Sequence, residues 1–350
     1  MQKEGDKQKH LHLPGMFISE LEGAFDEMGQ PKFRAKQMMD WYYAKGVQTF
    51  DAMKNLPAEL RARAAERIDL YRSSVDEQLT AVDGTMKLLL KLKDDARIET
   101  VIIPEPERLT CCISSQVGCA MGCVFCASGM CGLERSLSPG EIVEEVMQAG
   151  RAAGRRVTHV VVMGVGEPLA NYKAVVKALK ILNAEWSLNI AARRITVSTV
   201  GFPEAIEQLA AEGLQLNLAI SLHAPNDLIR NQIVPSNRRI GMDRLLHAGR
   251  HYFAKTGREI TLEYALIAGM NDGVAAAEEL ARRLKDYPCT VNVIPYNPVH
   301  ELGMAAPTEK GVQEFVDVLH RRGIRATVRR PRGVEISAAC GQLRASKAKT

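Results

Sequence analysis

Residues 111–129 read CCISSQVGCAMGCVFCASG, and this stretch places three cysteines directly after a predicted β-strand. Cys119, Cys123 and Cys126 have the spacing C-x3-C-x2-C, on a loop whose glycines permit a tight backbone. Three thiolates on one loop can hold three corners of a cubane iron–sulfur cluster, which usually has four cysteine ligands. A structural zinc site also needs four ligands, and the chain offers no second C-x2-C pair downstream. The cysteine loop therefore indicates a metal centre that lacks one cysteine ligand.

The strand before the cysteine loop is the first of seven candidate strands that alternate with helical segments. The candidates are residues 111–117, 158–164, 194–200, 216–222, 261–267, 289–295 and 324–330. Repeated strand–helix units predict a parallel sheet with helices outside it, and these units are too few for a closed eight-fold barrel. We therefore expect an α/β fold with a partial, open (βα)6 barrel over residues 111–343. In such a fold, functional groups follow the carboxyl ends of the strands.

The chain before the barrel divides into three parts. Residues 1–15 are polar and are expected to be disordered, whereas residues 16–75 have apolar residues at helical spacing and predict a small helical accessory domain. Its basic and aromatic residues between positions 32 and 43 suit RNA contact, although a solvated helix face explains them equally well. Residues 76–110 alternate like strands and predict a linker of two or three antiparallel strands, the β extension.

The composition limits the classes to which the protein can belong. The chain has 350 residues, of which 46% are hydrophobic, and no apolar run is long enough to cross a bilayer. The N-terminus lacks the apolar core of a signal peptide, so we expect a cytoplasmic protein without a membrane partner. In a reducing compartment, eight cysteines indicate metal binding or catalysis rather than a disulfide framework.

Basic residues are concentrated at the end of the chain. From residue 321 onward, nine Lys and Arg residues accompany the single acid Glu335, and residues 344–350 form a basic tail. This charge suits a phosphate backbone, and a solvated tail is an equally good interpretation.

Polar residues follow four of the later strands, at the carboxyl ends where functional groups are expected. A G-x-G turn precedes Glu167, and small hydrogen-bonding groups end the next strands. Taken singly, each is more often a cap or turn residue, but their occurrence in series favours a binding site at the barrel mouth. The candidates are Glu167, Ser198, Ser221, His223 and Asn297, together with Gly166 and Leu222, which adjoin them in the sequence.

Three further residues are candidates for chemistry. Cys112 lies on the strand before the cysteine loop, and Cys340 follows the basic run VRRPRG, whose arginines favour a thiolate. An inert buried thiol is the ordinary alternative for both. Glu99 lies in the apolar strand context RIETVIIPE, where it is either an exposed residue paired with a Lys or Arg, or a general base at the barrel mouth.

The cysteine spacing, with Phe125 before the last cysteine, resembles the signature of radical S-adenosylmethionine (radical SAM) enzymes. Within that superfamily, the order and spacing of the motifs resemble the RlmN-type adenine carbon-2 methyltransferases of large-subunit ribosomal RNA and transfer RNA. The resemblance runs from about residue 31 to residue 343. Its motifs are PKFRAKQ, RIETVIIPE, CCISSQVGCAMGCVFCASG, MGVGEPLANY, SLHAPND, IPYNP and RGVEISAACGQL.

The resemblance implies a [4Fe-4S] cluster on Cys119, Cys123 and Cys126, with SAM on the fourth iron. Gly166, Glu167, Ser198, Ser221, Leu222, His223 and Asn297 would contact SAM. One SAM would methylate Cys340, and a second SAM would supply a 5′-deoxyadenosyl radical that activates this methyl group for addition to adenine. Glu99 would accept the ring proton, and Cys112 would form a transient disulfide with Cys340 to release the methylated RNA.

The resemblance also implies partners and rivals. The substrates would be a specific adenosine at the peptidyl transferase centre of 23S rRNA and the adenosine next to the tRNA anticodon, with an electron donor such as flavodoxin and a monomeric enzyme. The rival in the family is Cfr, which methylates carbon 8, and Val117, Pro168 and Pro295 look like the carbon-2 branch. Residues 131–137 and 299–307 depart from the expected pattern. A zinc-containing RNA-binding protein and an iron–sulfur electron-transfer protein are the other classes.

Overall fold

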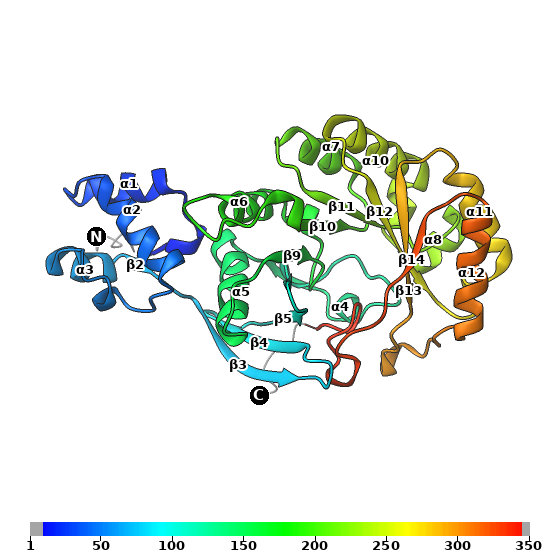
Figure 1. The fold of residues 1–350 in the computed structure, drawn as a ribbon, viewed down its shortest axis with the longest axis horizontal. Helices are drawn as coiled ribbons and strands as arrows, with labels where there is room; N and C mark the ends of the chain where they lie inside the picture. Colours follow the sequence, from blue (N-terminus) through cyan, green and yellow to red (C-terminus); the bar gives the residue numbers. More distant parts are fainter. Residues whose placement is uncertain (1–9, 345–350) are drawn as a thin grey trace, which may run out of the picture.

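The structure, a computed structural model, describes residues 10–344, and the parts of the fold follow one another along the chain (Figure 1). A small helical part in blue lies at one end of the molecule. An antiparallel extension in cyan links this helical part to a curved sheet, which is covered on its outer side by helices. The expected α/β fold with an open barrel is therefore present, together with accessory helices and a β extension.

The helical part begins earlier than the sequence predicts. Its elements are β1 (Leu11–His12), η1 (Leu13–Gly15), α1 (Ile18–Glu27), α2 (Phe33–Met39), the π-helical turn η2 (Asp40–Ala44), η3 (Phe50–Ala52), α3 (Ala58–Ala65) and β2 (Ile68–Asp69). The expected disorder of residues 1–15 is thus wrong for residues 11–15, while residues 1–9 and 345–350 lie outside the described residues. Leu13 and Pro14 are buried, and η1 packs against the first two helices of the barrel, α5 (Pro139–Ala152) and α6 (Tyr172–Asn183).

A buried carboxylate ties the helical part to the barrel. Glu144 on α5 is fully buried and accepts hydrogen bonds from His12 Nε2 at 2.5 Å, from the backbone N–H of Arg72 at 2.6 Å and from the Ser73 hydroxyl. One apolar core also runs continuously from Leu13 to the barrel. The accessory helices and the barrel therefore pack as one body.

The β extension continues the barrel sheet. Strands β3 (Ser73–Thr80), β4 (Met86–Leu92) and β5 (Arg97–Pro104) are antiparallel, and β5 pairs with the first barrel strand. The whole forms a ten-stranded sheet in the order β14-β13-β12-β11-β10-β9-β6-β5-β4-β3. Its two edge strands, β14 and β3, do not pair, so the barrel stays open.

The barrel consists of seven parallel strands joined by six crossovers, in agreement with the predicted (βα)6 arrangement. The strands are β6 (Leu109–Ile113), β9 (His159–Val162), β10 (Ile195–Thr199), β11 (Asn217–Ser221), β12 (Ile260–Leu266), β13 (Cys289–Pro295) and β14 (Ala326–Val328). Besides α5 and α6, the helices are α7 (Pro203–Ala211), α8 (Asp227–Ile233), α9 (Asn237–Ile240), α10 (Met242–Thr256), α11 (Val274–Arg283) and α12 (Glu309–Arg321), with the short η4 (Pro168–Asn171), η5 (Ala192–Arg194), η6 (His300–Leu302) and η7 (Val334–Ile336).

Successive side chains along each strand point alternately to the apolar core and to the interior of the barrel. Ile195, Val197, Leu218 and Ile220 are buried in the core with the helices. The alternate residues, such as Ser198, line the inner cavity described below. The inner face of the sheet is therefore free to carry polar groups. Among residues 10–344, no helix is both long and apolar enough to span a bilayer.

Candidate active site

The cysteine loop is fixed between two short strands above the barrel. After β6 the chain forms β7 (Gln116–Gly118), which pairs with β8 (Leu133–Ser136), and the loop between them contains the three cysteines and α4 (Ala127–Met130). Gly118 has a φ of +78°, and a Cβ there would lie 1.9 Å from the Gly132 carbonyl oxygen. That oxygen accepts a 2.8 Å hydrogen bond from the Cys119 N–H. A side chain at position 118 would thus displace the first cysteine.

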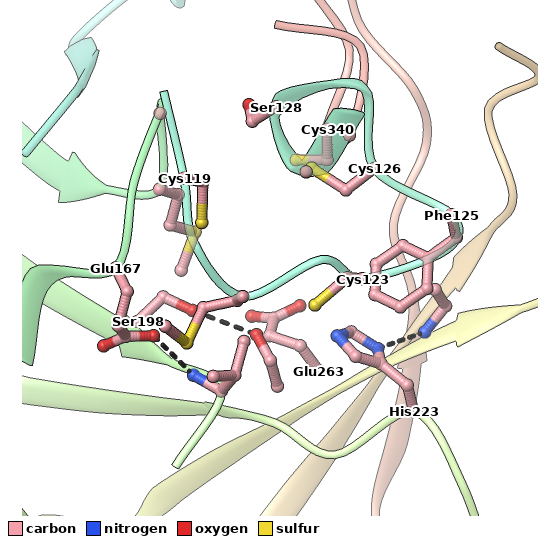
Figure 2. A pocket seen from close by; sticks show the side chains of 18 of the residues that line it. Cys119, Cys123, Phe125, Cys126, Ser128, Glu167, Ser198, His223, Glu263 and Cys340 are labelled. Atoms are coloured by element: carbon pink, nitrogen blue, oxygen red, sulfur yellow. Dashed lines mark hydrogen bonds between the residues drawn. The ribbon is translucent and has the colours of Figure 1, made fainter. Parts of the chain in front are cut away.

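The three thiols surround one cavity of about 150 Å³, as predicted from their spacing. Figure 2 shows Cys119, Cys123 and Cys126 on different sides of the open space. Burial raises the pKa of the Cys119 thiol to about 11, and burial also raises the pKa values of Cys123 and Cys126. Thiols in such surroundings ionise when a metal binds them. Among residues 10–344, no three His, Cys, Asp or Glu side chains lie close enough together to hold a single metal ion.

Polar groups around the loop suit a cluster of iron and sulfide. The backbone N–H groups of Ser128 and Gly129 act to lower the pKa of Cys126 against the effect of burial, and the N–H of Met121 does the same for Cys119. Donors of this kind stabilise thiolate ligands and tune the potential of an iron–sulfur cluster. The fully buried guanidinium of Arg230 adds a positive charge near Cys123. The donor set therefore fits three corners of a cubane cluster.

Glu167 lies at the end of β9, where the G-x-G turn was expected to present it. The side chain is 2% exposed and lines the cavity. Its carboxylate accepts hydrogen bonds from the N–H groups of Leu169 and Val200, each at 2.9 Å. Burial nevertheless raises its pKa to about 7. A cationic ligand group beside this carboxylate would favour its ionised form.

His223 lies across the cavity from Glu167 and stays neutral. Its Nδ1 accepts a 2.9 Å hydrogen bond from the Ala265 N–H, so Nε2 holds the proton. Burial lowers the pKa of the ring to about 3. The ring also packs edge-on against Phe125, the aromatic residue of the cysteine signature, with centroids 4.7 Å apart. The cysteine loop and the end of β11 are thereby held together.

Most of the other predicted contacts line the same cavity. Gly166, Ser198, Ser221 and Asn297 do so, and the hydroxyl oxygens of Ser198 and Ser221 lie 3.4 Å apart. Leu222 does not line it, because its side chain is fully buried in the core. Any contact from that residue would have to involve its backbone.

Cys340 connects this cavity to a second one. It lines the first cavity, and its carbonyl accepts a 3.1 Å hydrogen bond from Asn297 Nδ2. Cys340 and Cys112 both line the adjoining cavity, together with Arg329. The structure thus brings together two cysteines that are 228 residues apart in the sequence. All eight cysteines are free thiols in the described structure.

The electrostatics of the second cavity centre on Arg329. Burial, with a smaller contribution from the nearby Cys340, raises the pKa of the Cys112 thiol to about 12, and Arg329 acts in the opposite direction. The two cysteines and Glu263 in turn raise the pKa of the Arg329 guanidinium. Arg329 is therefore the cation that favours a thiolate on Cys112.

Glu99 lies beside this cavity rather than in the cavity of the three cysteines. Its carboxylate pairs with Lys87 Nζ at 2.9 Å and accepts a 2.7 Å hydrogen bond from the Arg344 N–H. Glu99 therefore forms the ion pair with a lysine that the sequence analysis gave as one of its two interpretations. On β5, Glu99 shares a face with Val101, which lines the cavity of Cys112 and Cys340. Its carboxylate is consequently held against the end of the segment that contains Cys340.

Sequence reasoning missed two buried charged residues. Glu263 on β12 is 5% exposed, lines the cysteine cavity and accepts a 2.8 Å hydrogen bond from Asn292 Nδ2. The sequence could have revealed Glu263, because this acid interrupts the otherwise apolar strand TLEYALI. Arg230 donates to the carbonyls of Val200, Ser221 and Leu222, and so joins the ends of β10 and β11. No local sequence pattern distinguishes it from a surface arginine.

Comparisons with known proteins agree with this geometry. Residues 113–284 match the radical SAM superfamily, and residues 11–70 match the ribosomal RNA large subunit methyltransferase N-terminal domain. A probable dual-specificity RNA methyltransferase RlmN of Rhodopirellula baltica is 44% identical over 96% of this chain and 91% of its own. That of Halalkalibacterium halodurans is 45% identical over 99% and 97%. The crystal structure of a radical SAM methyltransferase from Sphaerobacter thermophilus has a TM-score of 0.93 and 46% identity, over 95% of this chain and 99% of its own.

Proposed function

The chain belongs to the RlmN family of radical SAM RNA methyltransferases, and from this premise we propose that it methylates carbon 2 of adenosine in RNA through Cys340. The proposed substrates are an adenosine at the peptidyl transferase centre of 23S rRNA and the adenosine next to the anticodon of tRNA. The names of the curated relatives support a dual-specificity RNA methyltransferase. The position on the base and the carrier residue are the finer parts of the proposal.

The cysteine loop would hold the cofactor. Cys119, Cys123 and Cys126 would ligate a [4Fe-4S] cluster, and SAM would complete the fourth iron. When bound, this pair supplies one-electron cleavage of a sulfonium and hence radical chemistry. Glu167 would face the ammonium of SAM, and His223 would orient the nucleoside part with its Nε2–H. Ser198, Ser221, Asn297 and the backbone at Gly166 and Leu222 complete the proposed contacts.

The second cavity would carry the group transfer. The sulfur of Cys340 would take the methyl group as a thioether and lose its thiol proton. Before bonding to carbon 2 of adenine, the methyl carbon would give one hydrogen atom to the radical that the cofactor supplies. Glu99 would then accept the ring proton, and one electron would return to the cofactor. The Cys112 thiolate would attack the Cys340 sulfur, which forms a disulfide and breaks the sulfur–carbon bond, and the released carbon would keep the electron pair and take up a proton to become the methyl group of the RNA. This disulfide would be transient, as cytosolic disulfides usually are.

One observation supports this scheme most strongly. Cys112 and Cys340 line one cavity, and Cys340 also lines the cavity of the three cluster cysteines. A methyl carrier must reach both the SAM site and the residue that resolves its adduct, and Cys340 lies between them. Arg329 lines both cavities and acts to lower the pKa of Cys112, which favours the thiolate that the resolving step needs. We also propose a cytoplasmic monomer that takes its electron from a donor such as flavodoxin.

The proposed contact of Glu167 predicts a pH dependence of SAM affinity. Burial raises the pKa of this carboxyl group to about 7 in the free protein, so its negative charge is lost as the pH falls below about 7. SAM affinity is expected to be constant above that pH and to fall by up to about tenfold per pH unit below it. Equilibrium binding of SAM to the reconstituted protein between pH 5.5 and 8.5 measures this. Glu167→Gln should flatten the profile, and a sloping profile in that variant would count against the contact.

The identity of the modified nucleoside tests the proposed function. Unmodified tRNA transcript and 23S rRNA fragments are incubated anaerobically with the reconstituted protein, SAM and a reductant. The RNA is then digested, and its nucleosides are separated by chromatography and identified by mass spectrometry. The expected product is 2-methyladenosine. The isomeric 8-methyladenosine would assign the protein to the Cfr-like activity, and colourless protein with stoichiometric zinc would exclude the radical mechanism.

A further inference from the structure

A third cavity lies at the opposite end of the barrel strands from the cysteine loop. It has a volume of about 500 Å³ and is lined by the amino ends of β6, β9, β10 and β11, through Thr110, His159, Thr196 and Asn217. The chain after β14 forms another wall. Neither the cluster nor the proposed SAM contacts use this cavity.

The charge of this cavity is strongly positive. Its lining includes five arginines and one acid, Glu105, namely Arg108, Arg194, Arg329, Arg330 and Arg332. Glu105 is already paired with Arg108 at 2.7 Å. Burial, together with Arg108 and Arg194, lowers the pKa of His159, so the neighbouring imidazole adds hydrogen-bonding groups without further charge.

Two of these arginines lack acidic partners. Arg194 and Arg330 are exposed, and neither forms an ion pair with any residue between 10 and 344. Arg332 has only a 3.8 Å contact with Asp83. On a convex solvated surface, like charges can spread apart, but here they converge in a concavity where their repulsion is relieved best by an anion.

This cavity, called here the basic cavity, adjoins the cavity of Cys112 and Cys340. Met163, Arg329 and Arg330 line both cavities, as do Ile103 and Arg332. A polyanion bound in the basic cavity could therefore reach the neighbouring cavity that contains Cys340. A single small anion would not need such continuity, whereas a strand whose base reacts at Cys340 would.

We propose that the basic cavity binds the phosphodiester backbone of the RNA strand whose target adenosine lies against Cys340. This inference rests on the proposed function and adds the place where the substrate strand is held. Arg194 and Arg330 would contact phosphate oxygens, since guanidinium groups pair with phosphate in two parallel hydrogen bonds. The Thr196 hydroxyl can hydrogen-bond the ribose 2′-hydroxyl.

The double variant Arg194→Ala/Arg330→Ala tests this inference by RNA affinity. With an unmodified tRNA transcript and the reconstituted protein, fluorescence anisotropy should show affinity lower by at least roughly tenfold. The slope of log affinity against log salt should become shallower by about 0.7 for each phosphate contact removed. RNA-free formation of 5′-deoxyadenosine from SAM should equal that of the wild type, which shows that the barrel and cluster are intact.

The matched control removes the same charge elsewhere. Arg238 and Arg321 are exposed, form no ion pair within 4.0 Å with the described residues, and lie on α9 and α12 outside the lining of the cavity. Arg238→Ala/Arg321→Ala should keep the affinity and salt slope of the wild type. Equal losses in both double variants, or no loss in the first, overturn the inference. A wild-type protein that binds this RNA but methylates none overturns the proposed function instead, so the two failures are distinguishable.

Discussion

Replacing Cys123 by alanine is expected to abolish both the cluster and SAM cleavage. Cys123 is one of three thiols around the cavity, and with two thiols on the loop a cubane cluster would lack half of its usual ligands. Iron should fall from about four atoms per chain to near background, and the brown colour should be lost. Formation of 5′-deoxyadenosine should fall by more than roughly 1000-fold, because the electron source is gone.

Cys131 provides the matched control for this variant. It is an exposed thiol immediately after α4, close to the three cysteines in sequence but outside the cavity. Cys131→Ala should keep the iron content, colour and SAM cleavage of the wild type. Iron retained by Cys123→Ala, or lost equally from Cys131→Ala, would contradict the assignment of the three ligands.

Replacing Cys112 by alanine is expected to stop turnover after the methyl carbon has bonded to RNA. Cys112 shares the second cavity with Cys340, so its loss removes the thiol that would break the sulfur–carbon bond. The variant should be isolated from cells with RNA covalently attached, seen as a nuclease-sensitive shift on a denaturing gel. Multiple-turnover methylation should fall by more than roughly 1000-fold, while the cluster stays intact.

A neighbouring cysteine again supplies the control. Cys111 precedes Cys112 on β6 but faces the apolar core on the other side of the sheet. Cys111→Ala should be free of RNA and should turn over at nearly the wild-type rate. RNA-free Cys112→Ala protein with undiminished turnover would refute the two-cysteine scheme.

The fold was predictable because its signals are local and repeated. Each buried barrel strand is an apolar run between turn signals, so the seven predicted strands overlap the observed ones. The ordered start at residues 11–15 was missed because polar neighbours hide Leu13. Its burial depends on α5 and α6, more than 120 residues later in the chain, and no local pattern reports such packing.

The site was predictable where residues follow strand ends in parallel order. That rule placed Glu167, Ser198 and Ser221 around the cavity of Cys119, Cys123 and Cys126. The rule does not separate side chain from backbone at Leu222, whose side chain lies in the apolar core. It could not find Arg230, whose burial comes from carbonyls of two separate strands.

The mass of the trapped adduct tests the central claim, that Cys340 carries the methyl group to adenine, most directly. Cys112→Ala protein is isolated from cells, digested with ribonuclease and trypsin, and sequenced by tandem mass spectrometry. We predict a nucleotide attached through one carbon to Cys340 in the tryptic peptide 333–344. A nucleotide on any other residue, or an unmodified Cys340 peptide beside methylated RNA, would contradict the account.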